Sequence, residues 1–132
     1  MHKNSPAPHQ LVAALSQYLK VNLQLENGVC ALFDKQQLEM CIIELLPMST
    51  TAILHCAMGT RSHAPDRHSQ LLKLNLQPDK LNGCWLALDE TGEERLCAQC
   101  PMVFLTEESF CQWVTGFIEQ VGETRALLSQ TA

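Results

Sequence analysis

The clearest pattern in the sequence is the run FCQWVTGFIEQV, which spans residues 110–121. Its apolar residues recur at positions i, i+3, i+4, i+7, i+8 and i+11, the spacing that places them on one face of an α-helix. Thr106 suits the N-cap of this helix, and the two glutamates that follow suit its first turn. Because four of the seven aromatic residues lie between positions 104 and 117, we expect this helix to supply the main part of the hydrophobic core.

Upstream of this helix, shorter apolar runs bounded by turn residues predict further elements. The helical spacing of apolar residues after the first prolines predicts a helix over about 9–20. Three runs of apolar and β-branched residues then predict strands at 29–33, 38–46 and 50–58. Polar or proline-containing breaks separate these runs, so we expect the three strands to form an antiparallel meander.

The middle of the sequence predicts one more helix and a hairpin. Pro65 and Asp66 suit the start of a helix that runs to about Leu76, and its leucines fall on more than one face. Strands at 84–88 and 95–102 flank a polar loop and form a two-strand hairpin. The order is helix, three-stranded meander, helix, two-strand hairpin and helix, which indicates an α+β fold.

Composition limits the classes of protein that this chain can belong to. Its 132 residues suit one domain, which we place at residues 9–130 after a flexible leader at residues 1–8. A formal charge of −5 has the wrong sign for a nucleic-acid binder, and the apolar runs are too short for membrane insertion. The N-terminus lacks the apolar run of a secretory signal, so we expect a cytoplasmic protein.

The seven cysteines raise the alternative of a small zinc or thiol-redox protein. Cys97 and Cys100 have the spacing of a metal-binding or redox pair. In a strand, however, an offset of three residues places two side chains on opposite faces, where they cannot share a metal ion. A reducing compartment keeps such cysteines free, and free cysteines are usually buried as small apolar residues. We therefore expect no cofactor and no metal.

No motif in the sequence indicates an enzyme. The chain has no glycine-rich phosphate loop, no nucleophile elbow and no paired-histidine metal motif. His55 lies in an alternating apolar run, where a hydrogen-bonded strand histidine is the simplest interpretation. The leucine-rich second helix predicts either an ordinary core helix or the interface of a homodimer. A non-enzymatic adaptor that binds a folded partner protein is a further alternative.

Several stretches of the sequence resemble one known family, the small acidic class I chaperones of bacterial type III secretion. The similarity is closest to the DspF/AvrF-type chaperones of plant-associated bacteria, which serve AvrE/DspE-type effectors. It is carried by NGVCAL (27–32), LHC (54–56), LLKLN (71–75), GCWLALDE (83–90), RLC (95–97), SF (109–110) and GFIE (116–119). The run GCWLALDE is the most specific of these stretches.

The resemblance implies a homodimer that binds a non-globular segment of one effector and keeps it soluble and secretion-competent without hydrolysing ATP. In the family the second helix and the adjacent strand form the dimer interface. That interface would fall here on Leu71, Leu72, Leu74, Leu76, Trp85 and Leu86. Effector segments bind apolar grooves of the first helix and the sheet, by helix-in-groove and strand-addition contacts. Those grooves would draw here on Leu15, Leu19, Val29, Ala31, Phe33, Ile43 and Leu45.

Overall fold

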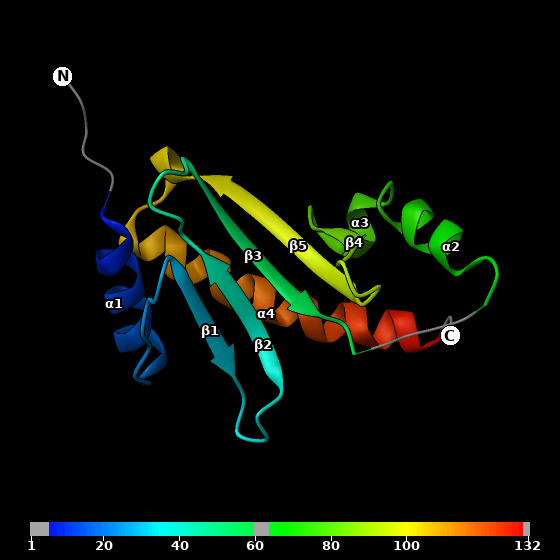
Figure 1. Ribbon diagram of the computed structural model, residues 1–132, viewed down its shortest axis with the longest axis horizontal. Coiled ribbons are helices and arrows are strands. Elements are labelled where there is room, and N and C mark those ends of the chain that lie inside the picture. Colours follow the sequence, from blue (N-terminus) through cyan, green and yellow to red (C-terminus); the bar gives the residue numbers. More distant parts are fainter. Residues whose placement is uncertain (1–5, 60–63, 131–132) are drawn as a thin grey trace.

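The chain forms a sheet of five strands and four α-helices in a computed structural model that describes residues 6–59 and 64–130. The helices are α1 (Pro8–Leu19), α2 (Arg67–Leu74), α3 (Pro78–Leu81) and α4 (Glu107–Gln130). The strands are β1 (Val29–Phe33), β2 (Glu39–Glu44), β3 (Thr51–Ala57), β4 (Trp85–Leu88) and β5 (Glu94–Pro101). The α+β fold and the order of its main elements are confirmed (Figure 1).

All strands join one antiparallel sheet in the order β1-β2-β3-β5-β4. The predicted meander and hairpin are therefore not separate units, because β5 pairs with β3 along its whole length. The chain crosses from β3 to the far edge through α2 and α3 and returns through the hairpin beside β3. This order leaves β1 and β4 at the two edges of the sheet.

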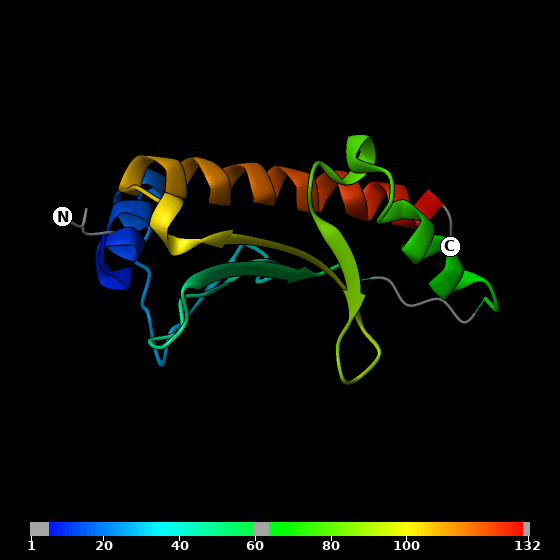
Figure 2. The ribbon, with the colours of Figure 1, turned by 90° about the horizontal axis from the view of Figure 1, so that it is seen from above.

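The long helix α4 covers one face of the sheet, as the pattern of residues 110–121 predicted. Figure 2 shows α4 lying along the sheet, with α1 beside its first turns and α2 near its other end. Phe110, Val114 and Phe117 are buried beneath it, and each strand alternates buried with more exposed residues. The sheet therefore has an inner face that packs on α4 and an outer face without a covering helix among the described residues.

The second predicted helix ends earlier than expected and is followed by a short additional helix. α2 stops at Leu74, and Pro78 begins α3, where proline suits the first turn because its missing N–H would have no partner. Asn82, with a left-handed φ of 54°, ends α3. Pro78 and Asn82 thus start and end a single helical turn. The predicted loop at 59–65 includes residues 60–63, and the predicted leader includes residues 1–5. Both of these segments lie outside the described residues.

Two polar contacts hold α2 against the sheet. The Arg67 guanidinium, 1% exposed, donates to both carboxylate oxygens of Glu94 at 2.8 and 2.9 Å. Just after α2, the Asn75 side chain donates to the Leu86 carbonyl and accepts from the Leu86 N–H, at 3.1 and 2.7 Å. Asn75 therefore occupies the outer edge of β4 as a neighbouring strand would, which closes this edge at Leu86.

Candidate functional site

An apolar groove lies between the end of α1, the edge strand β1 and the middle of α4. It has a volume of about 560 Å³. We call it the β1 groove, and it is lined by Leu19, Val21, Asn22, Leu23, Ala31, Leu32, Phe33, Met40, Thr115, Ile118 and Glu119. Phe33 and Val21 are large apolar residues that line this hollow, and each is 50% exposed. A solvent-facing apolar hollow of this kind is typical of a surface that binds another molecule.

The strand beside the groove has unpaired backbone groups. The Val29 N–H and C=O bond with Glu26, on the side away from β2, whereas the Gly28 C=O accepts from Leu45 on the β2 side. Because backbone groups of alternate residues point to the same side of a strand, the N–H and C=O of Ala31 face the open edge. Within residues 6–59 and 64–130, no strand pairs with β1 at Ala31 on this side. The groove thus combines apolar contacts with a free strand edge.

The predicted binding residues divide between this surface and the core. Leu19, Ala31 and Phe33 line the β1 groove, and Val29 lines an adjoining hollow. Three others, Leu15, Ile43 and Leu45, are 0–2% exposed and belong to the core, so they are corrected to supporting positions. The apolar stripe of α1 that contains Leu15 faces the protein interior, and Ile43 lies on the inner face of the sheet.

Eight groove residues were not predicted, and four of these are apolar residues that are not fully buried. Val21 and Leu23 follow α1 in a segment without regular structure, Met40 lies in β2 and Ile118 lies on α4. The sequence carried one signal for them: Val21, Asn22 and Leu23 alternate apolar and polar residues outside any predicted element. Ile118 was recognised as part of the apolar face of its helix, but its position at the border of that face leaves it only half-buried.

A second apolar surface lies on the last turn of α2, just after this helix and on β4. Leu72 is 68% exposed and Leu76 is 86% exposed, and Trp85 is half-buried on β4. The other residues predicted for a dimer interface, Leu71, Leu74 and Leu86, are 4–7% exposed and pack within the described chain. They are therefore corrected from contact residues to core residues that hold α2 and β4 in place. Leu88, which is 42% exposed, is a further apolar residue of β4 that was not predicted.

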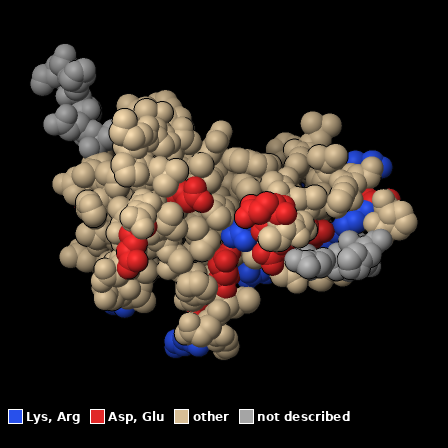
Figure 3. All heavy atoms as spheres, in the orientation of Figure 1, with Lys and Arg blue, Asp and Glu red and all other residues tan. Residues whose placement is uncertain are grey.

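Charged residues gather on the outer face of the sheet, whereas Glu119 is the one charged residue among the described residues that line the groove. Arg95 donates to Glu39 at 2.7 Å, and its Nε–H donates to Nδ1 of His55 at 3.0 Å. Since Nδ1 accepts this bond, the proton of the neutral ring lies on Nε2, which donates to Glu44 at 2.7 Å. The predicted hydrogen-bonded strand histidine is thus confirmed. Figure 3 shows the outer face, where the charged side chains cluster over the middle strands and the surface over α1 and β1 is mostly uncharged.

The cysteines do not form a metal or redox centre in the described part of the chain. Cys97 and Cys100 both lie in β5, so their offset of three places them on opposite faces, as predicted. Residues 6–59 and 64–130 contain no cluster of three or more side chains suited to a metal ion. Burial raises the pKa of the Cys84 thiol to about 11 and that of Cys56 to about 12, and it also raises the pKa of Cys97 and Cys100. Reactive thiols need the opposite shift.

We expect at most three thiols to react in the folded protein. Cys84, Cys97 and Cys100 are half-buried and the other four cysteines are buried, so a thiol reagent should count no more than three before denaturation and seven after it. Rapid reaction of all seven thiols at neutral pH would contradict this expectation.

The raised pKa values of the buried thiols also predict how stability depends on pH. The contribution of these thiols to the free energy of unfolding should be complete below about pH 8.5, the pKa of an unfolded cysteine, and should fall as the pH rises further.

Comparison with known proteins shows that the chain is similar to secretion chaperones. A sequence model of the Tir chaperone protein (CesT) family matches residues 10–125. No curated protein matches the sequence significantly. No helix of the described residues is long and apolar enough to cross a membrane.

Solved structures with a similar fold include chains of three complexes. A chain of the ExsC-ExsE complex is 21% identical with a TM-score of 0.72, covering 90% of this chain and 91% of that one. A chain of the HopA1-SchA chaperone-effector complex is 19% identical with a TM-score of 0.62, covering 84% and 92%. A chain of the complex of the Yersinia pestis type III secretion chaperone SycH with a YscM2 fragment is 14% identical with a TM-score of 0.62, covering 87% and 97%. At these identities the likeness shows the fold.

Proposed function

The chain belongs to the Tir chaperone protein (CesT) family, and from this premise we propose that it binds a non-globular segment of one type III effector at the β1 groove. The prediction of a type III secretion chaperone, and not an enzyme, is confirmed at the level of the family. We call the bound effector segment the client segment. In this proposal the chain acts in the bacterial cytoplasm and keeps the client soluble and secretion-competent without hydrolysing ATP.

The observation that carries the proposal is the coincidence of an apolar groove with an open strand edge. An extended segment can pair its backbone with Ala31 while its alternate side chains enter the groove beside Phe33 and Ile118. Ordering a flexible segment costs conformational entropy, and burial of its apolar side chains in a preformed groove offsets that cost. No covalent chemistry and no nucleotide are needed for such binding.

The resemblance supports a finer proposal, that the client is an AvrE/DspE-type effector and that the chain is a DspF/AvrF-type chaperone. Co-expression tests both levels. We expect the chain to keep one AvrE/DspE-type fragment soluble, to co-purify with it and to protect one extended stretch of it from protease. Recovery of a different effector by the tagged chain in its native bacterium would overturn the finer proposal alone. A partner whose solubility and secretion do not depend on the chain would indicate an adaptor instead of a chaperone.

We further propose that the chain forms a homodimer through α2 and β4. The support is the exposure of Leu72 and Leu76, because two large apolar side chains on one short segment are unfavourable in water. A dimer would also double the surface available to the client segment.

A charge at Leu72 should separate the two protomers. Because Leu72 is 68% exposed, Leu72→Asp leaves the protomer folded but places an unpaired carboxylate in the interface. Sedimentation at micromolar concentration should show a dimer for the parent protein and a monomer for Leu72→Asp. Val103→Asp, at a residue 70% exposed beyond β5, is the matched control and should remain dimeric. A parent protein that sediments only as a monomer would contradict the dimer.

A further inference from the structure

Half of β5 has a neighbouring strand on one side only. β5 has eight residues and β4 has four. β4 pairs with residues 94–97 of β5, whereas β3 pairs with β5 as far as Pro101. The part of β5 beyond Cys97 therefore forms a second open edge, next to the point where the chain enters β4.

The backbone groups of Gln99 point into this open edge. The Glu94 C=O accepts from Met58, and the Met102 N–H donates to Thr50, so the even-numbered residues direct their backbone groups toward β3. Gln99, an odd-numbered residue, directs its N–H and C=O to the opposite side. In the part of the chain that the structure describes, no hydrogen bond joins these two groups to a partner. They are available to an added strand.

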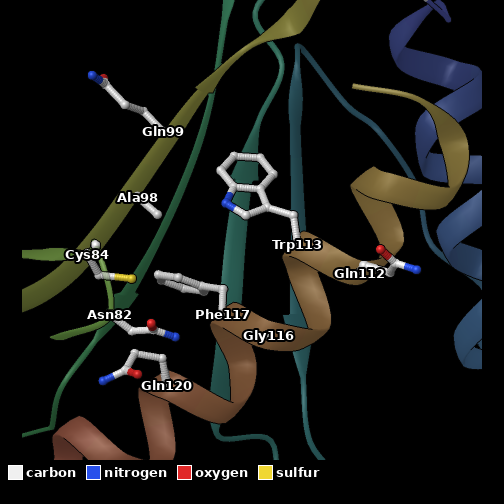
Figure 4. A pocket seen from close by; sticks show the side chains of 10 residues that line it. Asn82, Cys84, Ala98, Gln99, Gln112, Trp113, Gly116, Phe117 and Gln120 are labelled. Carbon is white, nitrogen blue, oxygen red and sulfur yellow. The ribbon is translucent and has the colours of Figure 1, made fainter. Parts of the chain in front are cut away.

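A crevice of about 230 Å³ lies between this edge and α4. Figure 4 shows Trp113 and Phe117 extending from α4 toward β5, with Gly116 between them and Cys84 just before β4. A Cβ atom added to Gly116 would meet no heavy atom within 4 Å. The glycine therefore leaves space at the place where the inward side chain of an added strand would lie.

We propose that this open half of β5 accepts an extended stretch of the client protein as an added strand in line with β4. The stretch pairs with the Gln99 N–H and C=O and directs one small or medium apolar side chain toward Gly116, between Trp113 and Phe117. The assignment of this added strand to a client protein rests on the proposed chaperone function. The outer edge of β4 does not compete at Leu86, because Asn75 already bonds both backbone groups of that residue.

The crevice lies close enough to the β1 groove for one client to occupy both. Thr115, Ile118 and Glu119 of α4 line the groove, while Gly116 and Gln120 of the same helix line the crevice. An α-helix with its side chains is about 10–12 Å across, and an extended chain advances about 3.3 Å per residue. A path over α4 follows half of its circumference, roughly 16–19 Å, so roughly five or six residues suffice for both sites to bind stretches of a single segment.

Residue-resolved NMR with a synthetic octapeptide of alternating valine and threonine tests the site. We expect the peptide to shift the Gln99 amide and the Trp113 indole signals, and an N-methylated version, which cannot pair its backbone, to shift neither. Gly116→Leu should weaken the response at Gln99 at least tenfold by filling the crevice. Gly122→Leu is the matched control, since Gly122 is an exposed glycine of the same helix with the same empty surroundings, and it should keep the response. Leucine favours the helix more than glycine does, so both variants should fold.

The Ala31 amide reports on the β1 groove independently. A shift at Ala31 without one at Gln99 overturns the β5 site and leaves the proposed function standing, whereas the reverse result supports the β5 site and counts against the groove. If the peptide shifts the Gln99 amide signal equally in Gly116→Leu, the assignment of this site to the client is overturned. The same holds if the signal shifts with protein concentration in the absence of peptide. Absence of any shift at Gln99 also overturns it.

Discussion

Arg67→Met should lower the free energy of unfolding by about 3–5 kcal/mol, the usual cost of removing one partner from a buried ion pair. Arg67 and Glu94 are 1% and 3% exposed and share two hydrogen bonds, and these bonds raise the pKa of the Arg67 guanidinium. The variant keeps the Glu94 carboxylate in the interior without the guanidinium. Because small domains are stable by only about 5–15 kcal/mol, this is a large fraction of the total. Urea unfolding followed by circular dichroism measures the loss.

The matched control replaces both partners. Arg67→Met with Glu94→Leu leaves no buried charge at this position, and apolar replacements of a whole ion pair are often close to neutral. The double variant should therefore be more stable than Arg67→Met alone. If the two variants lose the same free energy, the ion pair is not the cause, and packing of the Arg67 side chain would have to explain the loss. The comparison also tests how α2 is held on the sheet.

Phe33→Asp should weaken binding of the client segment by about 30-fold or more, equivalent to ~2 kcal/mol, the range of a central interface residue. The Phe33 ring lines the β1 groove and is 50% exposed, so the variant loses apolar contact area in the complex and places a carboxylate in the groove. The fold should persist, because half of the ring is already in water. Titration of a fluorescent client segment measures the affinity.

Met48→Asp is the control for this result. Met48 is 95% exposed in the turn between β2 and β3 and does not line the groove, so the same change of charge should leave the affinity within about twofold. Equal losses in Phe33→Asp and Met48→Asp would show that added negative charge alone weakens binding. Ile118→Asp, on the opposite wall of the groove, should behave like Phe33→Asp.

The sequence predicts the elements of this fold better than their pairing. Alternation in β3 and the helical spacing of residues 110–121 each depend on near neighbours, and both predictions are confirmed. The pairing of β3 with β5 depends on the crossing through α2 and α3, which local patterns do not encode. Pro78 illustrates a limit of predicting helix boundaries from local sequence, because proline both breaks one helix and starts another.

The candidate site shows a related limit. The periodicity of α1 identifies Leu15 as part of an apolar face. The hydrophobic effect drives both the packing of such a face in a core and its binding to a client, so the pattern alone does not distinguish the two. Only the position of α1 beside α4 shows that Leu15 is buried, whereas Leu19 reaches the groove. Phe33 was predicted for the groove only through the family resemblance, and it lies in the edge strand β1 and lines the groove. The segment with Val21 and Leu23 alternates apolar and polar residues, but three residues are too few to predict an element or a binding surface.

The exchange rate of the Ala31 amide hydrogen, with and without the client segment, tests the central claim most directly. The amide faces the open edge of β1, so it should exchange quickly in the free protein. Pairing with an added strand should slow its exchange by at least tenfold, while the Cys30 amide, on the side paired with β2, should already be slow in both states. Unchanged exchange at Ala31 in a saturated complex would contradict strand addition at the β1 groove.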